Sequence, residues 1–158
     1  MRVLAWISVV VCVIYTAIAT TYLVSQNYQV SRDIEAVAHR AQVAADAKEM
    51  LRYMQTWKVN MESHGMTEGY TALIFKTPSN DLSLLYASVK QIISRLEQIK
   101  DLPKSDTAYQ VALDDLRGTI RELETPSLGF VWVHNWMLFV LYVMWIWPFV
   151  HLVRMDFE

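Results

Sequence analysis

The 158 residues contain only one cysteine, four glycines and four prolines. Cys12 lies inside an apolar run, where a thiol is expected to act as a small hydrophobic side chain rather than as a disulfide or metal partner. No glycine-rich phosphate loop is present, and the motifs Glu-x-x-His, Cys-x-x-Cys and Gly-x-Ser-x-Gly are also missing. We therefore expect neither enzymatic activity nor a required cofactor from this chain alone.

An excess of charge of either sign is also missing. Between Arg32 and Glu124 the chain carries 12 basic and 14 acidic side chains. A nucleic-acid-binding domain is expected to have a basic surplus, and a disordered acidic tail has the opposite surplus. We therefore expect no nucleic-acid partner, and we expect these charges to form the solvated faces of helices.

What the sequence does contain is two stretches of 29 residues without Asp, Glu, Lys or Arg, at 3–31 and 125–153. The second stretch includes the run 130–153, which as a helix would be about 36 Å long. That length is enough to cross a hydrocarbon layer of about 30 Å with some tilt. Both stretches therefore predict transmembrane helices.

The domain boundaries follow from these two stretches. We predict an uncleaved signal anchor over 1–24, an extracytoplasmic domain over 25–125, a second transmembrane helix over 126–154 and a cytoplasmic tail over 155–158. Both termini then face the cytoplasm. The chain is predicted to be a two-pass integral membrane protein in contact with the lipid bilayer.

The extracytoplasmic domain is predicted to begin with one long helix. From Val30 to Met61 apolar residues recur in steps of three and four, and neither glycine nor proline occurs between Val24 and Gly65. This pattern predicts a continuous helix of about 40 residues, about 60 Å long, that projects from the membrane. It is expected to end at His64–Gly65, since glycine readily adopts the left-handed conformation that follows many helix ends.

The return path is predicted to be one broken helix from Asp81 to Thr125. Two apolar stripes with coiled-coil spacing are separated by a segment around Pro103, which the spacing favours as a kink rather than a reversal. The stripes consist of Leu85, Val89, Ile92, Leu96 and Ile99, and of Tyr109, Leu113, Leu116, Ile120 and Leu123. The predicted fold is an all-α membrane protein in which an antiparallel helical hairpin joins two transmembrane helices.

A four-helix sensor bundle of the chemoreceptor kind is the alternative topology. It requires the first long helix to turn near residue 45, where the sequence AADAKEM contains no turn residue. The outgoing helix and the return segment also have similar lengths, about 60 Å each. From the sequence we therefore favour the hairpin.

Sulfur, indole and imidazole side chains recur at helical spacing towards the end of the long helix. Thioether and imidazole ligands suit Cu(I), which an extracytoplasmic domain would be placed to meet. Methionine also fills irregular hydrophobic cores well, and core packing is the interpretation that we favour. The candidate copper ligands are Met54, Trp57, Met61, His64 and Met66, with Met50 one turn earlier.

Two histidines in the second predicted span, His134 and His151, are candidate ligands for a haem, a chlorophyll or a metal. Polar side chains at membrane depth usually face protein rather than lipid. For His134 and Asn135 we favour hydrogen bonds to the first span or to a neighbouring subunit. For His151, beside Arg154, we favour an interfacial position in which the ring reaches towards water.

The run Tyr70–Phe75 is apolar but too short to span a membrane. It either covers an end of the core, which we favour, or contacts a partner. The chain as a whole suggests an accessory or structural subunit that docks or spaces other membrane proteins, with a sensing or copper-handling module as the alternative. Either function is compatible with a homo-oligomer. The predicted partner contacts are Tyr70, Leu73, Ile74, Phe75, Trp132, Asn135 and Trp136.

Overall fold

The described residues form an all-helical fold. The computed structural model describes residues 2–123, 125, 127–141, 143 and 150. Apart from an isolated antiparallel bridge between Tyr70 and Asp81, every regular element in these residues is a helix. The elements are α1 (Arg2–Val30), the π-helix η1 (Ser31–Glu35), α2 (Ala36–Gln42), α3 (Ala47–Ser63), the 3₁₀-helix η2 (Pro78–Asn80), α4 (Leu82–Ile99), α5 (Thr107–Glu122) and α6 (Ser127–His134).

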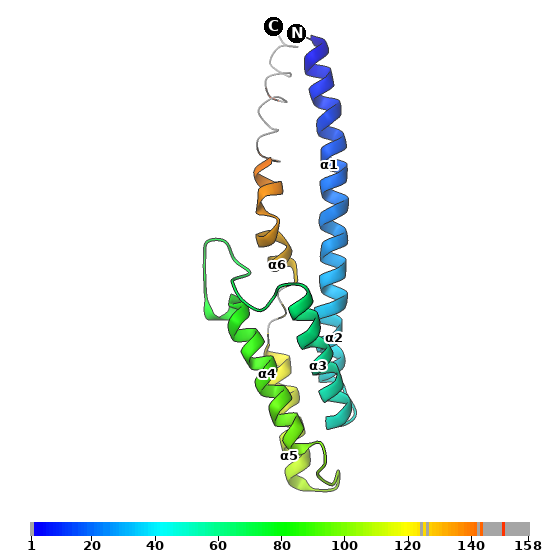
Figure 1. Ribbon diagram of the computed structural model, residues 1–158, viewed down its shortest axis with the longest axis vertical. Coiled ribbons are helices and arrows are strands. Elements are labelled where there is room, and N and C mark those ends of the chain that lie inside the picture. The colour runs from blue at the N-terminus through cyan, green and yellow to red at the C-terminus, as the bar shows by residue number, and fades with distance from the viewer. Residues whose placement is uncertain (1, 124, 126, 142, 144–149, 151–158) are drawn as a thin grey trace.

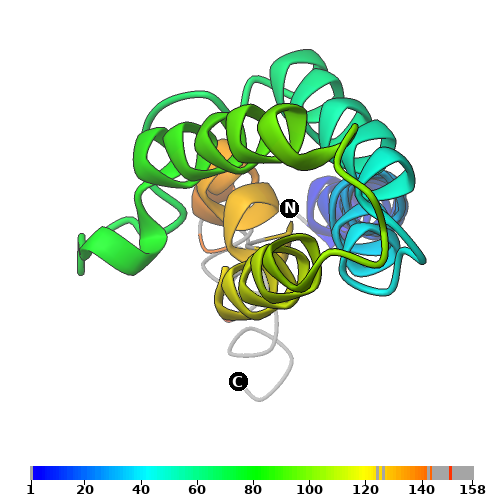
Figure 2. The ribbon, with the colours of Figure 1, turned by 90° about the horizontal axis from the view of Figure 1, so that it is seen from below.

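Four antiparallel helices, α2 to α5, form a bundle at one end of a long helical rod. The rod consists of α1, η1 and α2 in succession (Figure 1). α3 contacts α2 and α4, and α5 also contacts α2 and α4, so that the four helices surround a common core (Figure 2). After α5 the chain continues as α6, which packs beside α1. The first and last helices of the bundle therefore lead into the two apolar stretches of the sequence.

The chain reverses direction at residues 43–46, so the predicted continuous helix is wrong at this point. α2 ends at Gln42, and α3 begins at Ala47. The two helices then run antiparallel and in contact (Figure 1). Instead of a long helix out and a broken helix back, the described residues adopt the four-helix arrangement that the sequence disfavoured.

Two acidic side chains begin α3. Asp46 has an extended backbone, and its side chain accepts a 2.9 Å hydrogen bond from the backbone N–H of Glu49. The Glu49 carboxylate in turn accepts a 2.8 Å bond from the backbone N–H of Ala45. These bonds satisfy free amide groups at the start of the helix. The turn needs no glycine, because no residue at 43–46 has a positive φ. The buried side chains around the turn are all small: Ala38, Ala41, Ala44 and Ala47.

The break around Pro103 is also a reversal rather than the predicted kink. α5 runs antiparallel to α4 (Figure 1), and Asp106 caps it by accepting a 2.8 Å bond from the backbone N–H of Ala108. The buried side chain of Tyr109 then reaches across the bundle, and its hydroxyl oxygen accepts a 2.9 Å bond from the backbone N–H of Ala47. This bond fastens the beginning of α5 to the beginning of α3.

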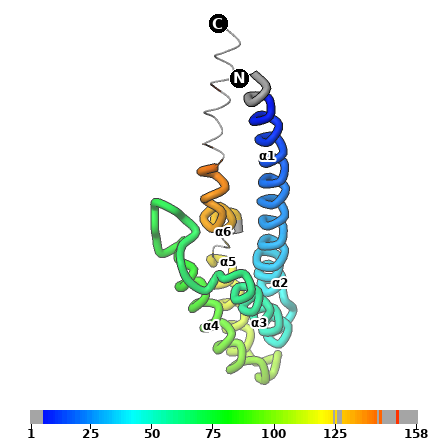
Figure 3. Tube along the Cα trace, turned by 45° about the horizontal axis from the view of Figure 1, so that its top comes forward, coloured from blue at the N-terminus to red at the C-terminus, as the bar shows by residue number. Residues whose placement is uncertain are grey.

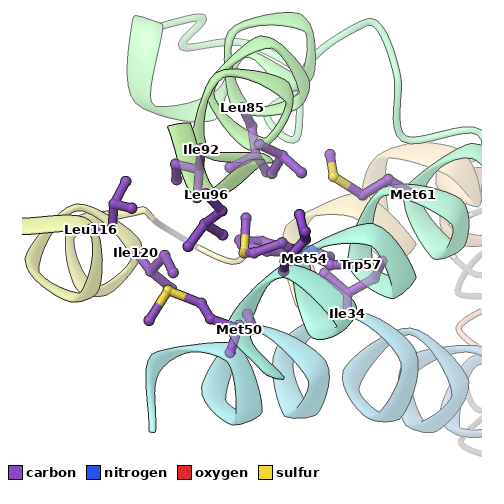
Figure 4. Packing of buried hydrophobic residues seen from close by; sticks show 14 of the residues in the cluster. Ile34, Met50, Met54, Trp57, Met61, Leu85, Ile92, Leu96, Leu116 and Ile120 are labelled. Carbon is purple, nitrogen blue, oxygen red and sulfur yellow. The ribbon is translucent and has the colours of Figure 1, made fainter. Parts of the chain in front are cut away.

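One hydrophobic core runs through the bundle. The predicted stripes are buried from Leu85 to Leu96 in α4 and from Tyr109 to Ile120 in α5. Trp57 of α3 is fully buried within this core (Figure 4). The same cluster extends to Val30 of α1 and Val131 of α6. The bundle and the neighbouring parts of α1 and α6 are therefore packed as one body.

Within the described part of the chain, one helix is long and apolar enough to cross a membrane, and it covers Trp6–Gln42. This helix includes most of the span predicted over 1–24. Its apolar side chains have few protein neighbours, as expected for a membrane span or signal anchor. More than half of the surface is exposed for Ile7, Val10, Val11, Val13, Ile14 and Ile18.

The second predicted span, 126–154, lies partly outside the described residues. Its described part is helical at 127–134 and at 136–141. The tail predicted over 155–158 lies wholly outside the described residues. The finding of one helix that could cross a membrane therefore applies only to the part of the chain that the structure describes.

Candidate functional site

The segment between α3 and α4 forms a loop with a fixed base. Gly69 has a φ of +96°, a conformation that favours glycine, and its carbonyl oxygen accepts a 2.9 Å bond from the backbone N–H of Leu82. The backbone N–H of Thr71 donates a second 2.9 Å bond to the carbonyl oxygen of Asn80. These two bonds join the ends of the loop, so that residues 72–77 project as its tip.

The loop tip presents three consecutive apolar side chains to the surroundings. Leu73 is 58% exposed, Ile74 is 81% exposed and Phe75 is 80% exposed. These three side chains therefore do not cover the core, contrary to the favoured interpretation of the run, whereas residues 70–72 are half-buried. A patch of large exposed apolar side chains on an ordered loop is typical of a surface that contacts another protein or a membrane.

Polar groups at the sides of the tip keep its backbone in place. The Asn80 side chain donates a 2.7 Å bond to the carbonyl oxygen of Phe75 and accepts a 3.1 Å bond from the backbone N–H of Thr77. Lys76 Nζ lies 4.9 Å from the centre of the Tyr70 ring, a favourable cation–π contact. The exposed apolar side chains therefore stand on a backbone that is already ordered.

The loop touches α6 at Gly129. A Cβ atom at this position would lie 2.8 Å from the carbonyl oxygen of Thr71 and 3.3 Å from the Thr71 Cβ atom. The first distance is shorter than Cβ atoms tolerate, so only glycine allows the loop to approach this closely. Figure 3 shows the loop beside α6. The loop tip is thus held next to the start of the second apolar stretch.

An apolar groove of about 510 Å³ lies between the loop and the C-terminal helix, the name used here for α6 and the described helical residues that follow it. The Trp132 ring stacks on the Phe139 ring, with their centroids 3.8 Å apart, and this fixes one wall of the groove. The structure brings together three of the predicted partner contacts, although Leu73 is far in sequence from Trp132 and Trp136. The groove is lined by Leu73, Trp132, Trp136, Phe139, Val140 and Val143.

A smaller pocket of about 220 Å³ lies between α1 and the C-terminal helix. One of its walls is Asn27, whose side-chain oxygen is buried and has no hydrogen-bond partner among the described residues. Asn135, in contrast, donates a 2.8 Å bond to the carbonyl oxygen of Val131, four residues earlier in the chain. The predicted bond from Asn135 to the first span or to another subunit stays a prediction.

Four of the candidate copper ligands, three on α3 and one just after its end, pack the core, as favoured from the sequence. Met54, Trp57, Met61 and Met66 are fully buried, as is Met50. Figure 4 shows Met50, Met54 and Met61 spaced along α3 among apolar side chains. No group of three or more His, Cys, Asp or Glu suited to a metal ion occurs in the described residues. Copper binding stays a prediction.

The fifth candidate copper ligand, His64, faces Asp33 of η1. His64 Nε2 lies 3.2 Å from Asp33 Oδ2, and the His64 side chain is 19% exposed. The Asn60 side chain donates a 2.7 Å bond to the carbonyl oxygen of the same aspartate. These contacts tie the end of α3 to the junction between α1 and α2.

Of the two candidate cofactor ligands, the structure describes only His134. The His134 ring packs against the Phe130 ring, with their centroids 4.3 Å apart. His151 lies outside the described residues. Ligation of a haem, a chlorophyll or a metal by either histidine stays a prediction.

Comparisons of this chain with protein-family models, with curated proteins and with solved structures find no match. The candidate site is therefore defined by its geometry alone. It consists of the loop tip, the groove and the bundle that carries them. The sequence prediction missed two features that shape this site, the start of α3 and the contact between the loop and α6. Asp46 and Glu49 carry a recognisable helix-start signal, whereas the contact between Gly129 and Thr71 leaves no local signal in the sequence.

Proposed function

We propose that the protein is an accessory subunit of a larger membrane complex. Two transmembrane helices hold it in the bilayer, both termini face the cytoplasm, and the four-helix bundle stands on the extracytoplasmic side. The observation that carries the proposal is the apolar groove between the loop and the C-terminal helix. In the complex this groove receives an apolar helix of another membrane protein.

The walls of the groove have the properties of a docking site for a helix. Trp132 and Trp136 contribute large apolar rings, and tryptophan is the residue type most enriched among the residues that dominate binding energy at protein interfaces. Stacking on Phe139 holds the Trp132 ring in one orientation before any partner arrives. A preordered ring loses less conformational entropy on binding than a mobile side chain does.

The bundle supports a docking or spacing role. Its core is filled by large side chains such as Trp57 and Met54, which are fully buried. The core also joins the bundle to α1 and α6, because Val30, Phe130 and Val131 belong to the same cluster. A solid bundle of this kind keeps a docking surface at a fixed position relative to the membrane.

The test of the docking role is to fill the groove in the full-length protein. We expect Val140→Trp to weaken a complex that is isolated from native membranes in mild detergent. Val13→Trp adds the same bulk to an exposed position on α1 that lies outside the groove, and it should leave the complex intact.

The mass of the isolated assembly provides the measurement. The proposal predicts a particle that contains a second membrane protein in addition to this chain of 18.4 kDa. A photoreactive residue at position 136 should crosslink to that protein. A particle that contains only a single copy of this chain would refute the docking role, and a crosslink only between two copies would replace it with self-association.

A second candidate function is sensing, and the reversal at residues 43–46 favours it. A four-helix bundle whose first and last helices lead into membrane segments can pass a change of packing to the other side of the membrane. A ligand can shift such a bundle only if it binds one arrangement more tightly than another. The copper version is tested by Cu(I) titration of the full-length protein, where a His64→Ala, Met61→Leu double variant should bind more weakly than the wild type.

A further inference from the structure

The loop tip has a composition that differs from that of the rest of the bundle surface. Residues 69–75 carry no charge, and Ile74 and Phe75 are at least 80% exposed. Neither side chain is needed to fill the bundle core, which is closed without them. Two large apolar side chains held in water at this exposure are unfavourable, and burial in an apolar phase would relieve that cost.

The contact with α6 fixes the position of the tip along the long axis of the molecule. Thr71 lies against Gly129, and Leu73 shares an apolar groove with Trp136 and Val140. Trp136 and Val140 belong to the apolar stretch that we propose as the second transmembrane helix. The tip is therefore level with the first turns of that helix, and Figures 1 and 3 agree in placing it there.

We propose that Ile74 and Phe75 insert into the lipid bilayer, in the headgroup region of the leaflet that faces the bundle. The tip then forms a third membrane contact beside the two spans. This inference rests on the membrane placement in the proposed function, but it does not need the partner helix in the groove. Its occupant is lipid, not protein.

The side chains around the tip suit a lipid interface. The Tyr70 ring and the Lys76 ammonium group lie together at the edge of the tip, with Lys76 Nζ 4.9 Å from the centre of the ring. Tyrosine and tryptophan rings prefer the headgroup level, and a lysine there can reach the lipid phosphates. Trp132 and Trp136 occupy the same level on the C-terminal helix. The tip thus continues an aromatic belt instead of forming an isolated patch.

The loop is also stiff enough to insert without first folding. The bonds that join Thr71 to Asn80 and Gly69 to Leu82 fix its base, and the Asn80 side chain holds Phe75 from within the loop. Insertion therefore orders only the exposed side chains. Because the bundle core anchors α3 and α4 on either side, insertion also limits the tilt of the bundle on the membrane surface.

The experiment places an environment-sensitive fluorophore on the tip of the full-length protein in liposomes. In a Cys12→Ser background, Phe75→Cys is labelled with a nitrobenzoxadiazole dye, and the vesicles contain lipids with a quencher near the headgroup or deep in the chain. Matched labels at Val111→Cys, on the exposed face of α5, and at Ile14→Cys, on α1, provide the water and lipid references. Circular dichroism confirms that each variant keeps its helices.

We expect the label at position 75 to emit at a shorter wavelength than the label at position 111, and to be quenched more strongly by the shallow quencher than by the deep one. A label at position 75 that matches position 111 would overturn the proposal. Emission at a shorter wavelength without lipid quenching would also overturn it, because the label would then contact protein. If the label at position 14 also escapes quenching, the membrane placement fails as well, which distinguishes the two failures.

Discussion

Substitution of Asp46 tests the reversal between α2 and α3. In the structure the Asp46 side chain accepts a bond from the Glu49 N–H and pairs with Lys104 Nζ at 2.7 Å. Asp46→Ala removes both interactions. Asp46→Asn keeps an oxygen that can cap the helix, because asparagine is as good a helix cap as aspartate, but removes the charge.

The expected size of the effect follows from the cap. Loss of an N-cap side chain costs about 1 kcal/mol of stability, which for a cooperative unit of about 150 residues lowers Tm by about 2 to 4 °C. Lys104 is 71% exposed, so its ion pair with Asp46 is screened by solvent and contributes little. We therefore expect Asp46→Asn to lower Tm by less than half as much as Asp46→Ala.

The same site predicts a pH dependence. Two hydrogen bonds lower the pKa of Asp46 below its ordinary value. The bond from the Lys104 ammonium group has the larger effect, and the bond from the backbone N–H of Glu49 has the smaller one. The stabilisation is therefore complete above the unfolded pKa of about 4 and is lost as the pH falls through the lower folded pKa. The difference in Tm between the wild type and Asp46→Asn should shrink as the pH falls below about 4.

The assay is thermal unfolding of the full-length protein in detergent, followed by circular dichroism. One outcome separates the two topologies. If the helix continued through residue 46, Asp46→Ala would raise Tm, because alanine is the better residue in a helix interior by up to about 0.7 kcal/mol. A rise in Tm, or equal effects of the alanine and asparagine variants, would refute the capped reversal.

Three further substitutions, each with a comparison variant, test the packing. Trp57→Ala should cost about 3 to 5 kcal/mol, because the side chain is fully buried, whereas Trp57→Phe should cost less, and urea unfolding measures both. Tyr109→Phe should cost about 1 to 3 kcal/mol by leaving the buried N–H of Ala47 unpaired, whereas Tyr86→Phe, which loses only an exposed bond to Glu62, should have a smaller effect on Tm. Gly129→Ala should push the loop away from α6, so that trypsin cleaves faster after Lys76 than in the wild type, while a Gly118→Ala control, with open space around its Cβ, should not change the rate.

The helical stripes were predictable because they depend only on local spacing. Leu85, Val89, Ile92 and Leu96 recur at the helical period, and this period places them on one buried face whatever the partner helix is. The same spacing does not reveal where a helix ends. The hairpin prediction relied on the lack of glycine and proline near residue 45, although Asp46 followed by Glu49 is itself a start signal for a helix.

The candidate site was predictable only in its parts. The apolar run of Tyr70–Phe75 and the tryptophans of the second apolar stretch were recognisable from composition, but their meeting in one groove depends on the approach of Thr71 to Gly129. That contact joins residues that are far apart in sequence and depends on how the whole bundle closes. The exposure of Phe75 likewise follows from the position of the loop, because the core is completed by other side chains.

The central claim is that both ends of the chain enter one bilayer from a bundle on its outer side. Labelling with a membrane-impermeant maleimide tests it directly in intact cells, in a Cys12→Ser background. We predict that Val111→Cys is labelled from outside, whereas single-cysteine tags at the N-terminus and at the C-terminus are labelled only after permeabilisation. Labelling of either terminal tag from the same side as Val111→Cys would contradict the account.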